Sequence, residues 1–226
     1  MLFMFLSGLF GGVFTFFCSK KGGFETKHVM YIMLFGFFGM DIGARALFAL
    51  TILPSVIKSG AQIDFNTLFG GMVFYGGMLG SVLGGFIYTK INRLNFLEYA
   101  DLFAPGMVLC HAIGRIGCYL AGCCYGFDCN FTLLGIKHTH FPLSLVEAFL
   151  LFVLFAVLCK IKAKKPGDIM RLYLVAYAVT RFVLEFFRGD EIRGRLLFFS
   201  TSQWISLAVI IWAVFYHLNS LKKKTE

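Results

Sequence analysis

Charged residues are scarce in this chain. Asp, Glu, Lys and Arg make up only 15% of its 226 residues and 58% are apolar, whereas an ordinary globular domain has about 25% charged and about 45–50% apolar residues. This composition argues against a water-soluble domain and favours a protein that is mostly surrounded by lipid. The 21 Lys and Arg outnumber the 12 Asp and Glu, but they fall between apolar segments and form no single face, which argues against nucleic-acid binding.

Long polar stretches are also absent. The longest polar connections cover only residues 54–66, 126–140 and 188–196, and no low-complexity linker or alignable repeat is present. A transmembrane helix needs about 20 apolar residues, whereas a barrel strand would alternate over about ten. Seven apolar segments meet the helical requirement: 1–18, 28–53, 67–89, 98–125, 141–159, 169–187 and 197–218. The sequence therefore predicts an all-α membrane protein, a bundle of about seven transmembrane helices that forms one integral membrane domain over residues 1–226.

The basic residues indicate how this bundle is oriented. One set of alternate connections carries 13 Lys and Arg, and the other set carries 5. Because Lys and Arg accumulate on the cytoplasmic side of a membrane, we expect the N-terminus outside and the C-terminus in the cytoplasm. Three further arginines, Arg45, Arg115 and Arg181, lie inside the predicted spans.

An arginine within a bilayer needs a partner, because it costs at least about 2.5–3.5 kcal/mol. Arg45 lies four residues after Asp41, and Arg181 lies four before Glu185, spacings that place each pair on one helix face. The simplest interpretation of these two pairs is that they orient helices. The alternative is that the three arginines form an anion site.

Arg115 has no carboxylate three or four residues away, and its neighbour four residues earlier is His111. Its partner is therefore a distant acid, such as Asp101 or Glu147, or the anion of a ligand. A planar guanidinium with several parallel donors suits phosphate best, so we favour the ligand.

The third predicted span is rich in glycine. Gly76, Gly80 and Gly84 recur every fourth residue, a spacing that permits close crossing of helices. The alternative is that Gly76-Gly77, directly after Tyr75, leave backbone amides open to a lipid head group, because glycine lets a ligand approach the main chain.

Cysteines gather at the end of the fourth predicted span, which the charge count places outside: Cys118, Cys123, Cys124 and Cys129. Disulfides persist in an oxidising compartment, so we expect at least one within this group. The pairing stays open, although a bond between the adjacent Cys123 and Cys124 would be strained. Zinc bound with His111, His138 or His140 would need a CxxC or HxxxH spacing, which is missing; we predict no metal site.

Several motifs in a shared order resemble bacterial prolipoprotein diacylglyceryl transferases. They begin with Gly114-Arg115-Ile116-Gly117, read together with Gly76-Gly77 and with Tyr177, Arg181, Glu185 and Arg188. Weaker fragments are similar to the family's motifs as well: Gly43-Ala44-Arg45, Met72 to Gly77, Asp101 to Pro105, Phe141 to Glu147 and Ser202 to Ser206.

The resemblance implies a multi-pass enzyme of the bacterial cell (inner) membrane that needs no cofactor. It transfers the diacylglyceryl group of phosphatidylglycerol to a cysteine thiol of a lipoprotein precursor. Arg115 and Arg181 would bind phosphate and act in catalysis, and either Tyr75 or His111 would accept the thiol proton. The resemblance implies a substrate-binding set of Arg45, Gly76, Gly77, Gly114, Gly117, Glu185 and Arg188, with Glu185 orienting Arg181.

The chain departs from the family pattern at functional positions. Tyr75 replaces a histidine, and Cys118, Ala121 and Cys123 replace two amides and a carboxylate. These departures leave two alternatives open. A membrane thiol-disulfide oxidoreductase would account for the cysteines but not for the three arginines, and a lipid-binding protein with altered chemistry would account for arginines without a competent base. The acceptor, the acyl-chain specificity and the oligomeric state stay open.

Overall fold

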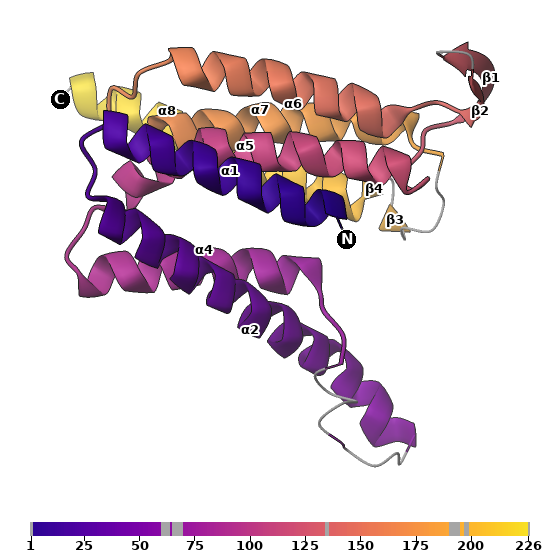
Figure 1. The fold of residues 1–226 in the computed structure, drawn as a ribbon, viewed down its shortest axis with the longest axis horizontal. Helices are drawn as coiled ribbons and strands as arrows, with labels where there is room; N and C mark the ends of the chain where they lie inside the picture. Colours follow the sequence, from indigo (N-terminus) through magenta and orange to yellow (C-terminus); the bar gives the residue numbers. More distant parts are fainter. Residues whose placement is uncertain are drawn as a thin grey trace. The chain divides into compact units, whose positions relative to one another are not determined.

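The computed structural model describes residues 2–59, 64, 70–133, 136–189, 195–196 and 199–225. Within them the chain forms seven α-helices (Figure 1): α1 Leu2–Lys21, α2 Thr26–Ser59, α4 Phe74–Ile91, α5 Phe96–Leu120, α6 Leu143–Lys160, α7 Asp168–Leu184 and α8 Thr201–Thr225. The predicted mainly helical architecture is confirmed. Three of these helices, α2, α5 and α6, are long and apolar enough to cross a membrane.

Short strands accompany the helices and were not predicted. Strands β1 (Asp128–Leu133) and β2 (Ile136–His140) form an antiparallel pair with an irregular register between Asp128 and Phe131. Strands β3 (Arg195–Leu196) and β4 (Phe199–Ser200) form a second antiparallel pair. Strands β1, β2 and β3 lie in connections between predicted spans, whereas β4 occupies the start of the predicted span 197–218, whose helix α8 begins at Thr201. Pairing between strands is not visible in a count of apolar residues.

The chain divides into two compact units. Unit 1 comprises Met1–Thr15 and Ala100–Glu226, and unit 2 comprises Phe16–Tyr99. The single membrane domain expected from the sequence stays a prediction.

Unit 2 is built on the contact between α2 and α4 (Figure 1). Gly39 and Gly43 of α2 meet Gly80 and Gly76 of α4 backbone to backbone, and a Cβ added at any of the four would collide with a carbonyl oxygen of the facing helix. The close helix crossing predicted from the glycine spacing is therefore confirmed, since small residues let two helix backbones approach closely.

Helix α4 begins seven residues later than predicted, at Phe74 instead of residue 67. Residues 65–69 lie outside the description, and Gly70 to Val73 are not helical. The backbone N–H of Val73 donates instead to the carbonyl of Ala44 on α2, at 3.1 Å. This bond satisfies the amide of the residue just before the helix. A count of consecutive apolar residues cannot predict such a contact between two helices.

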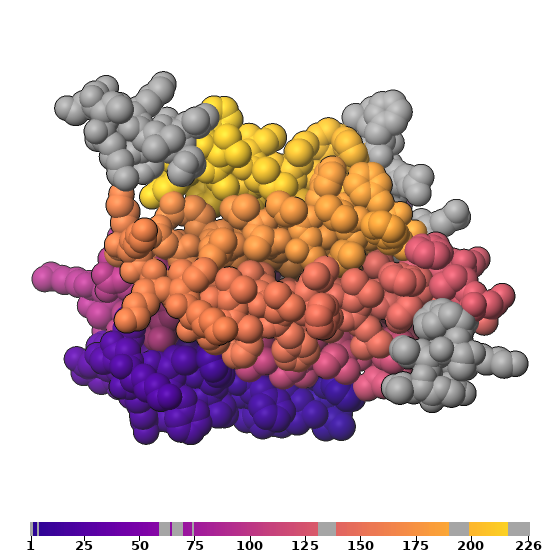
Figure 2. Space-filling model, turned by 90° about the horizontal axis from the view of Figure 1, so that it is seen from above, coloured from indigo at the N-terminus to yellow at the C-terminus, as the bar shows by residue number. Residues whose placement is uncertain are grey.

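Unit 1 has its core between α5, α6 and α7. Val108 and Ala112 of α5 pack with Leu151 and Leu158 of α6 and with Tyr173 of α7. The side chains of α6 and α7 (orange) and of α8 (yellow) form a continuous surface in Figure 2.

Asp101 of α5 stabilises the start of α7 from a distance in sequence. Its two carboxylate oxygens accept hydrogen bonds of 2.8 Å from the backbone N–H groups of Gly167 and Met170. Gly167, the residue before α7, has no side chain to cap the helix, and its φ is 92°. A carboxylate satisfies the orphan N–H groups of the first turn and interacts favourably with the positive end of the helix dipole.

Candidate functional site

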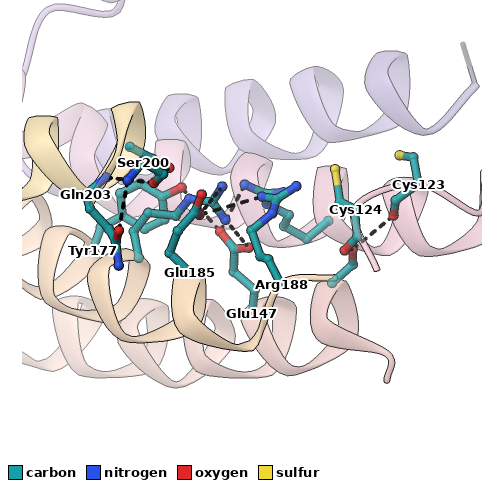
Figure 3. Close-up of polar contacts among 12 residues, drawn as sticks. Cys123, Cys124, Glu147, Tyr177, Glu185, Arg188, Ser200 and Gln203 are labelled. Carbon is teal, nitrogen blue, oxygen red and sulfur yellow. Dashed lines mark hydrogen bonds and ion pairs between the residues drawn. The ribbon is translucent and has the colours of Figure 1, made fainter. Parts of the chain in front are cut away.

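A group of buried ionised residues lies where α5, α6 and α7 meet in unit 1 (Figure 3). We call it the arginine-glutamate cluster. Its members come from α5, from α6, from the end of α7 and from the segment after it: Arg115, Glu147, Arg181, Glu185 and Arg188.

Glu147 is the centre of this cluster. One carboxylate oxygen, Oε1, lies 3.0 Å from Nη2 of Arg115, and the other, Oε2, lies 3.3 Å from Nη1 of Arg181. The hydroxyl of Tyr177 donates to Oε1 at 3.2 Å. The Glu147 side chain is only 2% exposed, so these three donors supply the compensation that a buried carboxylate needs.

Glu185 forms the second half of the cluster. Its Oε2 lies 3.1 Å from Nη2 of Arg181, which confirms the ion pair predicted from the four-residue spacing, and 3.9 Å from Nη1 of Arg188. Within the described residues this buried oxygen has no hydrogen-bond partner, because neither contact has hydrogen-bond geometry. Among the described residues, three guanidinium groups and two carboxylates form this cluster.

The partner of Arg115 is the main feature that local spacing did not reveal. Of the two distant acids named from the sequence, Asp101 is occupied at the start of α7, and Glu147 is the partner. Glu147 and Tyr177 were not among the predicted site residues. Their place in the sequence could have identified them, because both Glu147 and Tyr177 lie in fragments that resemble motifs of the family.

His111 lies one helical turn before Arg115 and belongs to the same unit. Its ring meets the ring of Tyr177 edge to face, with 4.7 Å between centroids. His111 thus contacts the tyrosine that donates to Glu147.

Gly114 and Gly117, on either side of Arg115, differ in their surroundings. A Cβ on Gly117 would come within 2.6 Å of Phe3 of α1, whereas a Cβ on Gly114 would meet, among the described residues, no atom within 4 Å beyond the neighbouring backbone of its own helix. Gly117 is thus required for helix packing, and Gly114 borders open space.

The other predicted site residues, Arg45, Tyr75, Gly76 and Gly77, belong to unit 2. Arg45 Nε donates to both oxygens of Asp41, at 3.0 and 3.1 Å, which confirms the predicted pair. The N–H of Gly77 donates to the carbonyl of Val73 at 3.1 Å, so this amide is used within the helix. Tyr75 is 41% exposed.

All seven cysteines are reduced thiols in the structure, so the disulfide expected in the outer group is not formed here and stays a prediction. The sulfur atoms of Cys118, Cys123 and Cys124 nevertheless lie within 4.8 Å of one another. Cys129 lies in β1.

A sequence profile of the prolipoprotein diacylglyceryl transferases matches residues 2–218. The chain belongs to the prolipoprotein diacylglyceryl transferase family. Relatives named phosphatidylglycerol-prolipoprotein diacylglyceryl transferase occur in several bacteria. The one from Clostridium tetani (strain Massachusetts / E88) is 31% identical over 91% of this chain and 86% of its own length.

Two further relatives extend this comparison. Phosphatidylglycerol-prolipoprotein diacylglyceryl transferase 2 of Clostridium perfringens (strain 13 / Type A) is 34% identical over 82% of this chain and 76% of its own length. The one from Clostridioides difficile (strain 630) is 32% identical over 91% of this chain and 83% of its own length. Membership of the family thus covers both units and includes the whole arginine-glutamate cluster.

Proposed function

We propose that this chain is an integral membrane transferase that moves the diacylglyceryl group of phosphatidylglycerol to a cysteine thiol of a prolipoprotein. The observation that carries this proposal is the buried arginine-glutamate cluster, in which Glu147 holds Arg115 and Arg181 together in an apolar surrounding. It lies in a member of a family whose relatives are named for this reaction.

The reaction breaks the bond between a glycerol carbon and a phosphate oxygen, and forms a bond between that carbon and sulfur. Glycerol phosphate leaves, and the thiol proton passes to a base. Positive groups that are already in place beside the leaving phosphate stabilise the transition state, and such preorganised charge is usually the largest contribution to catalysis.

Arg115 and Arg181 are the phosphate ligands in this proposal. Each uses one terminal nitrogen to hold Glu147, and a guanidinium group has further N–H donors in the same plane. Arg181 also uses its other terminal nitrogen for Glu185, so Glu147 and Glu185 fix the two cations in position, and a phosphate would share their N–H donors with these carboxylates. Two guanidinium groups held side by side suit the two charged oxygens of a phosphodiester.

Glu185 is suited to the head group of the lipid. Its Oε2 is buried, forms ion pairs with Arg181 and Arg188, and accepts no hydrogen bond within the described residues, so it can accept one from a bound hydroxyl. A hydroxyl of the phosphatidylglycerol head group would satisfy this oxygen and place the phosphate between Arg181 and Arg188.

His111 is the base that we favour for the thiol proton. It lies four residues before Arg115 on α5, and its ring contacts Tyr177, so it belongs to the surroundings of the cluster. Tyr75, at the position of the family's histidine, is the alternative, and separate His111→Ala and Tyr75→Phe variants distinguish the two.

The membrane arrangement is also part of this proposal. The seven helices would span the inner membrane of a bacterial cell, with the N-terminus outside and the C-terminus in the cytoplasm. The alternating distribution of Lys and Arg and the three helices that are long and apolar enough to cross a bilayer support this.

Product analysis tests the function. The purified protein is incubated with phosphatidylglycerol labelled in its acyl chains and with a peptide that carries a lipoprotein-precursor cysteine. We expect a thioether-linked diacylglyceryl peptide and free glycerol phosphate. Lipid binding without product would favour the altered lipid-binding protein, and turnover of a peptide disulfide instead would favour the thiol-disulfide oxidoreductase.

A further inference from the structure

The turn that follows α5 brings three cysteines together. Gly122 adopts a left-handed conformation with φ of 67°. The N–H of Gly122 donates to the carbonyl of Tyr119 at 3.0 Å, and the N–H of Cys123 donates to the carbonyl of Cys118 at 3.1 Å. This is the Schellman arrangement, in which the second residue beyond the helix end folds back over the last turn. Here the two residues that meet in this way are cysteines, Cys123 and Cys118.

Cys124 is held beside this pair by a second turn. Its φ is 59°, a conformation that a residue with a side chain rarely adopts. The hydroxyl of Ser144 on α6 donates to the carbonyl of Cys124 at 2.9 Å. In Figure 3 the sulfur atoms of Cys123 and Cys124 point the same way. The backbone and α6 thus position the thiols.

The geometry points to a binding site for one thiophilic metal ion, Zn(II) or Cu(I), formed by Cys118, Cys123 and Cys124. Their sulfur atoms lie within 4.8 Å of one another, and two thiolates that each bind a tetrahedral zinc at about 2.3 Å are about 3.8 Å apart. Small side-chain rotations are enough to close that difference. Thiolate ligands select Zn(II), Cu(I) and similar soft ions.

The charges around the three thiols favour such a complex. Three thiolates around a divalent or monovalent ion leave a net negative charge. Arg115 lies three residues before Cys118 on the same helix, and its side chain and that of Arg188 are mostly buried. Both arginines also contact carboxylates, Arg115 with Glu147 and Arg188 with Glu185, and their positive charges reduce the electrostatic cost of a negative complex nearby.

The spacing of the ligands explains why no metal site was predicted from the sequence. The cysteines are separated by four residues and by none, and neither spacing is the CxxC pattern of common zinc sites. A metal ion and the disulfide expected for this group compete for the same sulfur atoms, so metal occupancy would keep the thiols reduced.

Metal binding to the full-length protein, purified in detergent and stripped with a chelator, tests the site. Zinc sulfate is added in one arm, and Cu(I) with ascorbate in the other. Bound metal is measured by mass spectrometry after gel filtration. We expect one ion per chain for the parent and for the matched control Cys159→Ser, and Cys123→Ser should weaken binding by at least about tenfold. The arm with tighter retention identifies the ion.

A second measurement uses the parent protein alone and does not depend on how the variants fold. The bound ion should slow maleimide labelling of Cys118, Cys123 and Cys124 while leaving that of Cys159 unchanged, and a chelator should reverse this protection. Equal labelling with and without metal would overturn the proposal. So would equal metal content in the parent and in a variant with all three cysteines changed to serine.

Discussion

At the residue scale, one carboxylate explains how two arginines are buried side by side in an apolar chain. Glu147 holds Arg115 and Arg181 at once, so neither cation is buried without compensation. The same contacts both stabilise the two arginine side chains and preorganise them for function. Nη2 of Arg181 also pairs with Glu185, so a phosphate would bind to an arginine pair that is already held in place by carboxylates.

The first prediction concerns Arg115→Lys. Lysine keeps the charge beside Glu147 but loses the planar set of donors, so transfer activity or phosphatidylglycerol binding should fall by about 1.5–3 kcal/mol, the value of a hydrogen bond to a charged group. Binding and turnover are measured on the purified variant. The control is Arg171→Lys at the start of α7, where the arginine pairs with Asp168 outside the cluster; it should behave like the parent.

Either of two results would contradict the Arg115 prediction. One is a variant that purifies normally and turns over phosphatidylglycerol as the parent does. The other is a loss of thermal stability as large as that of Glu185→Ala, which would indicate a structural cation.

A second prediction concerns the contribution of Glu147 to stability. Glu147→Gln leaves two buried guanidinium groups without their shared carboxylate, and breaking a buried ion pair costs about 3–5 kcal/mol. Thermal unfolding in detergent should show a large decrease in stability. Asp168→Asn removes one partner of a more exposed pair and should cost at most about 1 kcal/mol. Equal losses in the two variants would exclude a central role for Glu147.

At the element scale, the contact between α2 and α4 depends on the absence of side chains. Gly80 faces the carbonyl of Gly39, whereas a Cβ on Gly85 of the same helix would meet only Ile32, at 3.6 Å. The two glycines therefore differ in what they tolerate, although both lie within one helix.

A third prediction rests on this difference. Gly80→Ala should destabilise the protein by about 1–3 kcal/mol, because overpacking a close contact forces the backbones apart. Gly85→Ala should be neutral or stabilising by up to about 1 kcal/mol, because alanine favours the helix. Thermal unfolding of the two variants is the measurement, and a Gly80→Ala protein as stable as Gly85→Ala would contradict the prediction.

At the scale of the whole molecule, the charge distribution predicts the topology. The 13 and 5 basic residues of the two sets of connections predict seven spans with the N-terminus outside. This is the fourth prediction. A series of fusions to alkaline phosphatase and to a fluorescent protein measures it, and we expect a reporter attached after residue 221 to fluoresce in the cytoplasm. Phosphatase activity from that position would contradict the orientation.

The sequence by itself determined the helical architecture and the local pairs. Apolar runs indicated seven helices because burying backbone polar groups in lipid requires helices. Four-residue spacings revealed the pairs of Arg45 with Asp41 and of Arg181 with Glu185, and the close crossing at Gly76, Gly80 and Gly84, because such residues share one helix face.

Only the tertiary structure decided the distant contacts. The pairing of Arg115 with Glu147 joins two helices, and no periodicity within one helix contains that information. The convergence of Cys118, Cys123 and Cys124 depends on positive φ angles at Gly122 and Cys124, which composition and spacing do not encode. Contacts within a helix are set by its repeat, whereas contacts between helices depend on how turns and packing place the helices.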